Sequence, residues 1–126
     1  MGDITANFDR SEFACKCGCG FDMIDTSLVI DLQRIRNRLG RPIIVTSGCR
    51  CEKHNAAEGG SYLSDHTKGL AVDIAVANSG ERFDILEANF RNTFPIFEIM
   101  ELVKNWIHFS VNQNKPKRIA FLSTKA

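Results

Sequence analysis

The segment from Leu70 to Ala77 constrains the fold more than any other part of the chain, because its side chains alternate as in a β-strand. Ala71, Asp73 and Ala75 fall on one face. The other face carries larger apolar residues: Leu70, Val72, Ile74 and Val76. This alternation predicts a strand that packs one face on a hydrophobic core. Asp73 should therefore point away from the core.

A second alternating segment, in the last third of the chain, is typical of a β-hairpin. Within residues 106–111, Trp106, His108 and Ser110 fall on one face, opposite apolar residues. We expect three further parts around it: a partner strand over residues 97–102, a tight turn near Lys104–Asn105, and an edge strand over residues 118–122. His108 should then lie on the more polar face of the hairpin.

Two other segments show the spacing of amphipathic helices. The first can be capped by Asp25 or Thr26 and ends at Gly40 and Pro42. Its apolar positions recur at helical spacing: Leu28, Leu32, Ile35 and Leu39. The second is expected over Glu81–Asn92, with three residues facing inward: Phe83, Leu86 and Phe90.

The remaining segments are shorter or irregular. Ile43–Val45 predicts a short buried strand, and Cys49–Lys68 is typical of a long functional loop. Residues 1–24 are expected to form an irregular, cysteine-rich arm, anchored to the core by Phe8 and Phe13. The order of elements predicts an α+β fold, with an antiparallel sheet and flanking helices in one domain spanning residues 1–126.

The charge balance excludes several classes of partner. The chain has 16 basic and 15 acidic side chains, so charge alone favours neither nucleic acid nor an anionic membrane. It contains no apolar run long enough for a transmembrane segment, and its start lacks the pattern of a secretory signal. We therefore expect synthesis in the cytoplasm.

Three polar residues on these segments match the needs of a hydrolytic zinc site. Such a site takes three protein ligands and keeps a fourth position for water, whose pKa the ion lowers. His66 lies just before the strand of Asp73, so the two can reach one ion, and His108 lies on the polar face of the hairpin. A single histidine on a strand is more often structural, so the prediction of one catalytic zinc ion depends on the three acting together.

The sequence around these residues resembles the M15 zinc D,D-peptidases. Residues 64–74, SDHTKGLAVDI, match the SxHxxGxAxDI signature of that family. Upstream, GRPIIVTSGCR at residues 40–50, followed by HN and GG pairs, is similar to its GxPIxITSGxR block. Downstream, WIHF at residues 106–109 is similar to its closing strand. With SEFACKCGCG at residues 11–20, the similarity covers residues 11–111 and is closest to the small bacteriophage-encoded forms.

The resemblance implies the hedgehog/D,D-peptidase-like version of the fold and a zinc peptidase acting on peptidoglycan stem peptides. Zinc-activated water would hydrolyse D-Ala-D-Ala-type or crosslink bonds, so the site of action would be the bacterial cell wall. His66, Asp73 and His108 would bind the zinc. Arg50 would hold the substrate near the metal, and Ser64 would contact the substrate or orient His66. Carboxypeptidase and endopeptidase activities are not distinguished.

The general base is less clearly marked. Several relatives place a carboxylate three residues before the last ligand or an aspartate two residues after it, where this chain has Asn105 and Ser110. A two-residue hairpin turn would pair Glu101 with His108 on one face, which makes Glu101 the predicted base. A register slip of one residue would turn Glu101 away. Two other carboxylates are alternatives: Asp65 and Glu98.

Five cysteines form two groups along the chain: Cys15, Cys17, Cys19, Cys49 and Cys51. They can form a second, structural metal site, a redox staple between the arm and the loop after Thr46, or reduced thiols. Because the Cys-x-Cys spacing differs from the usual Cys-x2-Cys knuckle, no metal is assigned to them here.

Two other functions remain open at this point. One is a zinc-binding module of the same fold that has lost catalysis and binds the cell wall or another protein, as Asn105 and Ser110 permit. The other is a zinc or redox protein whose functional centre is the cysteines.

Overall fold

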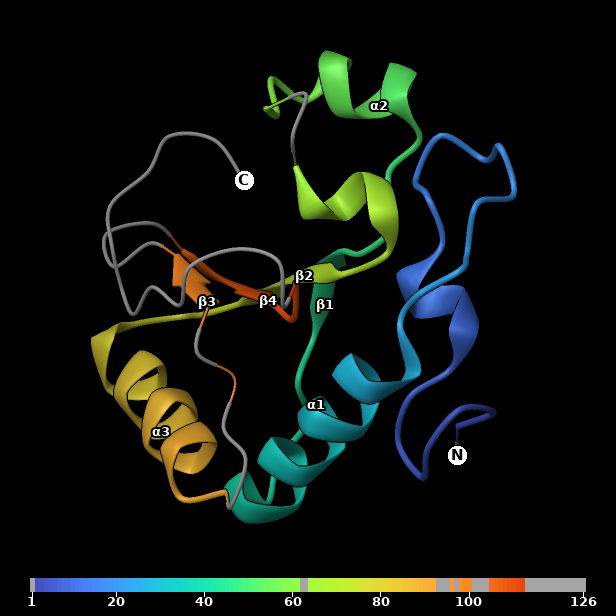
Figure 1. The fold of residues 1–126 in the computed structure, drawn as a ribbon. Helices are drawn as coiled ribbons and strands as arrows, with labels where there is room; N and C mark the ends of the chain where they lie inside the picture. Colours follow the sequence, from blue (N-terminus) through green and yellow to red (C-terminus); the bar gives the residue numbers. More distant parts are fainter. Residues whose placement is uncertain (1, 62–63, 93–95, 97, 101–104, 113–126) are drawn as a thin grey trace.

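The computed structural model describes residues 2–61, 64–92, 96, 98–100 and 105–112, which combine helices with short strands (Figure 1). The helices are α1 (Thr26–Leu39), α2 (Glu52–Ala57) and α3 (Ser79–Phe90), with 3-10 helices η1 (Arg10–Phe13) and η2 (Asp65–Lys68). The strands are β1 (Val45–Ser47), β2 (Ala71–Ala75), β3 (Glu98–Met100) and β4 (Trp106–Ser110). This combination confirms the predicted α+β fold class.

The strands form one antiparallel sheet in the order β1-β2-β4-β3. In the central pair, Asp73 of β2 is opposite His108 of β4, and Ile74 is opposite Ile107. Opposed residues share a face of a sheet. Asp73 and His108 therefore lie on one side, as the alternation predicted, while the apolar residues of both strands lie on the other.

The two faces of the sheet are covered by different elements. Helices α1 and α3 lie along one face, and η2 and α2 lie beyond the other (Figure 1). The hydrophobic core fills the α1 and α3 side and includes, from these helices and the central strands, Leu28, Leu32, Ile35, Val72, Ile74, Ile85, Ala88, Ile107 and Phe109. The polar face is left for the side chains that carry chemistry.

Helix α1 begins and ends where its capping residues predicted. The Asp25 carboxylate accepts hydrogen bonds from the backbone N–H of Ser27 at 2.8 Å and of Leu28 at 3.4 Å, which satisfies donors in the first turn. Gly40 ends the helix in the left-handed conformation with φ of 74°. No helix in the described part of the chain is long and apolar enough to span a bilayer.

Helix α3 differs from the prediction in its bounds and in the face that it buries. It begins at Ser79, because the Asn78 side chain accepts a hydrogen bond from Glu81 N–H at 2.8 Å and caps it there. Phe83 is 63% exposed and Phe90 is 40% exposed, so their predicted inward orientation is wrong.

The buried face of α3 is instead set by Ile85, Ala88 and Asn89. The Asn89 amide makes two hydrogen bonds of 2.9 Å with the backbone of Ile96, one as donor and one as acceptor. A buried amide is stable only with such partners. Asn89 therefore faces inward, and this rotation of the helix leaves Phe83 outside.

The N-terminal arm packs on the core as predicted. Phe8 and Phe13 are buried, and their rings lie 5.9 Å apart. Gln33 of α1 ties the arm further, since its amide accepts hydrogen bonds from Thr5 and Asn7 and donates one to the Asn7 side chain. The arm is irregular except for η1 and a single bridge between Thr5 and Phe8.

The segment between α1 and β2 is more regular than predicted. The first strand lies at Val45–Ser47 rather than at Ile43–Val45, and Ile44 is 63% exposed. A bulge in β1 brings Ser47 opposite Asp73. The predicted loop over Cys49–Lys68 contains both α2 and η2.

The predicted hairpin register is wrong by one residue. In the sheet, Met100 is opposite His108, and Ile99 is opposite Phe109. The pairing that placed Glu101 across from His108 does not occur. Glu101 itself lies outside the described residues, as do Lys104 of the predicted turn and the predicted edge strand at residues 118–122.

Candidate metal centre and active site

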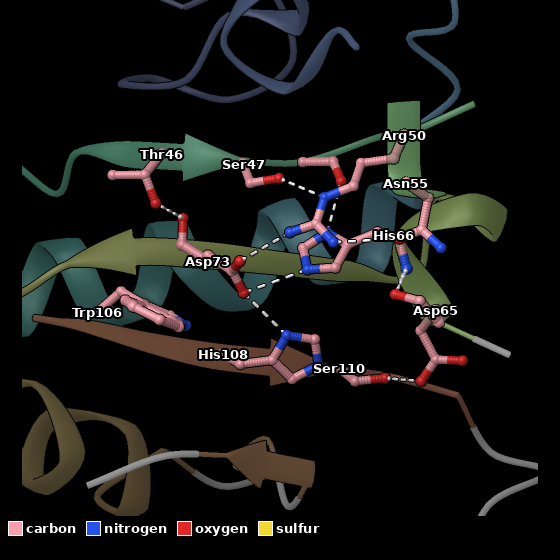
Figure 2. Close-up of polar contacts among 12 residues, drawn as sticks. Thr46, Ser47, Arg50, Asn55, Asp65, His66, Asp73, Trp106, His108 and Ser110 are labelled. Carbon is pink, nitrogen blue, oxygen red and sulfur yellow. Dashed lines mark hydrogen bonds and ion pairs between the residues drawn. The ribbon is translucent and has the colours of Figure 1, made fainter. Parts of the chain in front are cut away.

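Three side chains that are distant in the sequence converge on the polar face of the sheet (Figure 2). His66 comes from η2, Asp73 from the middle of β2 and His108 from the middle of β4. One nitrogen or oxygen atom from each lies within 4.8 Å of the other two, and all three residues are buried. The structure thus brings together the three residues that the sequence suggested as zinc ligands.

The spacing of the donor atoms suits a tetrahedral ion. Asp73 Oδ1 lies 3.2 Å from His66 Nε2 and 2.8 Å from His108 Nδ1. Around zinc, with bonds of about 2.0 to 2.2 Å, neighbouring ligand atoms are about 3.4 Å apart. Two imidazole nitrogens and one carboxylate oxygen are also donor types that catalytic zinc takes, with a fourth position left open.

The orientation of His66 favours a cation next to its Nε2 atom. His66 Nδ1 lies 2.7 Å from the Gly48 carbonyl oxygen, so Nδ1 carries the ring proton and donates it. Burial lowers the pKa of His66, which keeps the ring neutral. Nε2 then presents a lone pair to the Asp73 oxygen 3.2 Å away. Two such acceptors repel each other unless a cation lies between them, so this part of the site fits a metal ion.

Asp73 supplies negative charge to the cluster. Burial acts to raise its pKa, but the hydrogen bond with His108 opposes burial, and the pKa lies below its ordinary value. Its second oxygen, Oδ2, accepts a hydrogen bond of 3.2 Å from Arg50 Nη2. One carboxylate thus joins both histidines and the arginine (Figure 2).

Arg50 is held in place by partners on both sides. Its Nε donates to Ser47 Oγ at 3.0 Å, and its Nη1 donates to Asn55 Oδ1 at 3.2 Å. Gly60 allows this arrangement, because a Cβ at that position would lie 2.2 Å from Asn55 Oδ1 and 3.1 Å from Arg50 Nη1. The guanidinium has five N–H donors, and the bonds to Ser47, Asn55 and Asp73 occupy one each.

The loop that carries His66 is fixed by its two ends. Ser64 caps η2 by accepting a hydrogen bond from His66 N–H at 3.3 Å, so it orients the backbone of His66. At the other end, Gly69 has φ of 70°, and a Cβ there would lie 2.1 Å from the Met23 carbonyl oxygen. The contact of Ser64 with a substrate remains a prediction.

A cavity of about 260 Å³ opens beside Asp73 and Arg50. Its wall is formed by Lys16, Thr46, Ser47, Arg50, His54, Glu58, Gly59, Gly60, Asp73 and Trp106. Lys16 and Arg50 make part of this wall cationic. Besides Asp73, its carboxylate is that of Glu58, which lies 3.4 Å from His54 Nε2. A cavity of about 400 Å³ between the arm and β1 is larger but contains none of the converging residues.

Asp65, an alternative base in the sequence, is engaged elsewhere. Its Oδ2 accepts a hydrogen bond from Ser110 Oγ at 2.5 Å, and its Oδ1 accepts one from Asn112 Nδ2 at 2.8 Å. Asp65 is buried and does not line the cavity. Ser110, which occupies the position of an aspartate in several relatives, therefore contacts a carboxylate that comes from η2.

Some residues of the site were not found from the sequence. Ser47 and Asn55 lie within the SG and HN pairs that carried the resemblance, so their support of Arg50 could have been assigned. Glu58 lies outside the matched segments. Lys16 lies within SEFACKCGCG, but its approach to the cavity depends on the path of the arm. His54 lies outside the group of converging donors and pairs with Glu58.

Comparison with known proteins adds one finding. A family model described as peptidase M15 matches residues 6–110, a span that contains the cluster of His66, Asp73 and His108. No match to a curated protein was found.

Proposed function

The chain belongs to the peptidase M15 family, and from this membership we infer that it is a zinc-dependent peptidase acting at His66, Asp73 and His108. One observation carries the proposal. The donor atoms of these three residues lie within 4.8 Å of one another, beside a cavity that Asp73 lines.

The residues around the proposed zinc site have separate tasks. Zinc, when bound, supplies Lewis acidity that activates water and polarises a peptide carbonyl. The Gly48 carbonyl fixes the ring of His66, and Asp73 contributes negative charge to the ligand set. Arg50 lines the cavity and retains N–H donors that can hold an oxygen atom of the peptide.

We propose that the substrate is the stem peptide of peptidoglycan, cleaved before its terminal D-alanine in the cell wall. The cationic side chains of Lys16 and Arg50 on the cavity wall support binding of a free carboxylate. A cavity of about 260 Å³ also suits the end of a short peptide more than a crosslinked strand. This favours carboxypeptidase over endopeptidase activity.

Three substrates test this proposal: a stem pentapeptide ending in D-Ala-D-Ala, its C-terminal amide, and a crosslinked dimer. The zinc-loaded protein should release D-alanine from the first, and a chelator should stop the release. The amide should lower kcat/KM about 10- to 100-fold, because a charged hydrogen bond of about 1.5 to 3 kcal/mol is lost. Equal cleavage of the dimer would overturn the carboxypeptidase assignment. Binding without any cleavage would overturn the peptidase and support the binding module.

We further propose Glu58 as the group that accepts the proton from the attacking water. Of the carboxylates on the cavity wall, Asp73 is already assigned to the metal, which leaves Glu58. His54, 3.4 Å from Glu58, can hold the carboxylate in position or relay the proton. Glu101, the base predicted from the sequence, is the alternative proposal.

Replacing Glu58 with glutamine should lower kcat about a hundredfold, the lower end of the usual effect of a general base, with metal content unchanged. Glu101→Gln tests the alternative in the same assay. Glu87→Gln, on the exposed surface of α3, is the matched control and should have no effect. If Glu101→Gln gives the large loss and Glu58→Gln does not, the assignment to Glu58 is wrong.

A further inference from the structure

Four cysteines from two distant segments gather at one point on the surface. Cys15, Cys17 and Cys19 lie on the arm after η1, and Cys51 lies directly before α2. The sulfur atoms of all four lie within 4.8 Å of one another. The arm runs beside the start of α2 in Figure 1, in agreement with these sulfur positions.

The sulfur separations are those of a four-thiolate metal site. Cys17 Sγ lies 3.4 Å from Cys15 Sγ and 3.6 Å from Cys51 Sγ. Around a tetrahedral zinc ion with Zn–S bonds of about 2.3 Å, neighbouring sulfur atoms are about 3.8 Å apart. The contacts do not divide into two disulfide pairs, because Cys17 approaches two different partners.

Backbone donors are aimed at two of the sulfur atoms. Cys51 N–H donates to Cys15 Sγ, and His54 N–H donates to Cys51 Sγ, both at 3.4 Å. Hydrogen bonds of this kind stabilise the negative charge of thiolates that ligate a metal. The fifth cysteine, Cys49, is different: its side chain lies in the hydrophobic core, and it is not part of the group.

We propose that Cys15, Cys17, Cys19 and Cys51 bind one structural Zn²⁺ ion in a tetrahedral site, separate from the catalytic centre. Four thiolates in this geometry suit zinc or iron, and a hydrolytic enzyme has no electron transfer that requires iron. The ion would join the arm to Cys51, the residue that follows Arg50. It would therefore stabilise the segment that presents Arg50 to the cavity.

Metal content gives the first test. Protein purified under reducing conditions and loaded with Zn²⁺ should hold two ions per chain. The double variant Cys17→Ser, Cys19→Ser should hold one, and Cys49→Ser, the matched control, should hold two. Cys17 and Cys19 are exposed, so their replacement leaves the core intact. One ion in both the unchanged protein and the double variant would overturn the proposal, and so would iron in place of zinc.

Cobalt provides a second test, whose deciding measurement is made on the unchanged protein and does not depend on peptidase activity. Co²⁺ bound to the unchanged protein should give intense thiolate-to-cobalt charge-transfer absorption. The double variant should lose this absorption, while His108→Ala should keep it, because the thiolate site does not use the catalytic ligands. Absence of the absorption in the unchanged, reduced protein would overturn the four-thiolate site whether or not the protein cleaves peptides.

Discussion

Replacing His108 with alanine is expected to lower kcat/KM for peptide hydrolysis about a thousandfold or more. The activation that zinc supplies is worth several kcal/mol, and each 1.36 kcal/mol corresponds to a factor of ten in rate. The side chain lies on the polar face of β4 and contacts Asp73, so its removal leaves the packing of Ile107 and Phe109 in place. Kinetics and metal analysis on the same preparation would measure the loss of kcat/KM and the loss of the metal ion.

His54→Ala is the matched control for metal content, because His54 is the remaining histidine of the chain. It lies outside the converging donors, so the variant should keep the full metal content. His108→Ala, by contrast, should lose one ion per chain. If His108→Ala kept both its metal and its turnover, the metal centre assigned to these residues would be wrong.

Replacing Arg50 with alanine should lower the free energy of unfolding of the zinc-free protein by about 3 to 5 kcal/mol. Its ion pair with Asp73 is buried, with each side chain 8% exposed, and removing one partner leaves a buried charge without compensation. In the zinc-loaded protein the loss should be smaller, because the ion also neutralises Asp73. Urea unfolding of both forms, with and without a chelator, would measure the difference.

Arg41→Ala controls for the loss of an arginine ion pair as such. Arg41 Nη2 lies 3.1 Å from Asp84 Oδ2, close to the 3.2 Å between Arg50 Nη2 and Asp73 Oδ2. The side chains of Arg41 and Asp84, however, are 43% and 51% exposed. An exposed pair contributes less than about 1 kcal/mol. Equal losses in the two variants, or a loss for Arg50→Ala that zinc does not change, would contradict the proposed coupling between Arg50, Asp73 and the metal.

The parts of the fold that local pattern controls could be predicted from the sequence. The alternation in β2 and β4 identified both central strands and placed Asp73 and His108 on one face. Helix α1 followed from Asp25 and Gly40, because both caps act within one turn of the helix that they bound. In these elements the determining contacts lie within a few residues, where a sequence pattern is informative.

Other parts depend on contacts between segments or on unusual caps. Helix α2 was missed because Cys51 caps it by accepting a hydrogen bond from His54 N–H, and a thiol is a weak signal for a helix start. The orientation of α3 depends on Asn89 bonding to Ile96. The hairpin register was wrong because periodicity shows which residues alternate but not which residue of the partner strand lies opposite, and a shift of one residue exchanges the two faces.

The candidate site likewise contains residues that sequence patterns identify and residues that only the folded chain brings together. Its proposed zinc ligands were marked by motif and strand face, but the pairing of Arg50 with Asp73 joins positions 23 residues apart. The approach of Glu58 and Lys16 to one cavity likewise requires the folded chain. Side chains that have no motif and meet only in the folded chain were therefore the ones that the sequence did not identify.

The carbonyl of Gly48 links the ring of His66 to the beginning of the chain. A Cβ at Gly48 would lie 2.8 Å from the backbone of Phe13, and Cys49 N–H donates to the Phe13 carbonyl at 2.8 Å. The imidazole of this proposed metal ligand is thus aligned through the backbone of Phe13, a residue outside the group of converging donors. A substitution at Phe13 would therefore change the affinity of the site for the metal, although all three ligands stay the same.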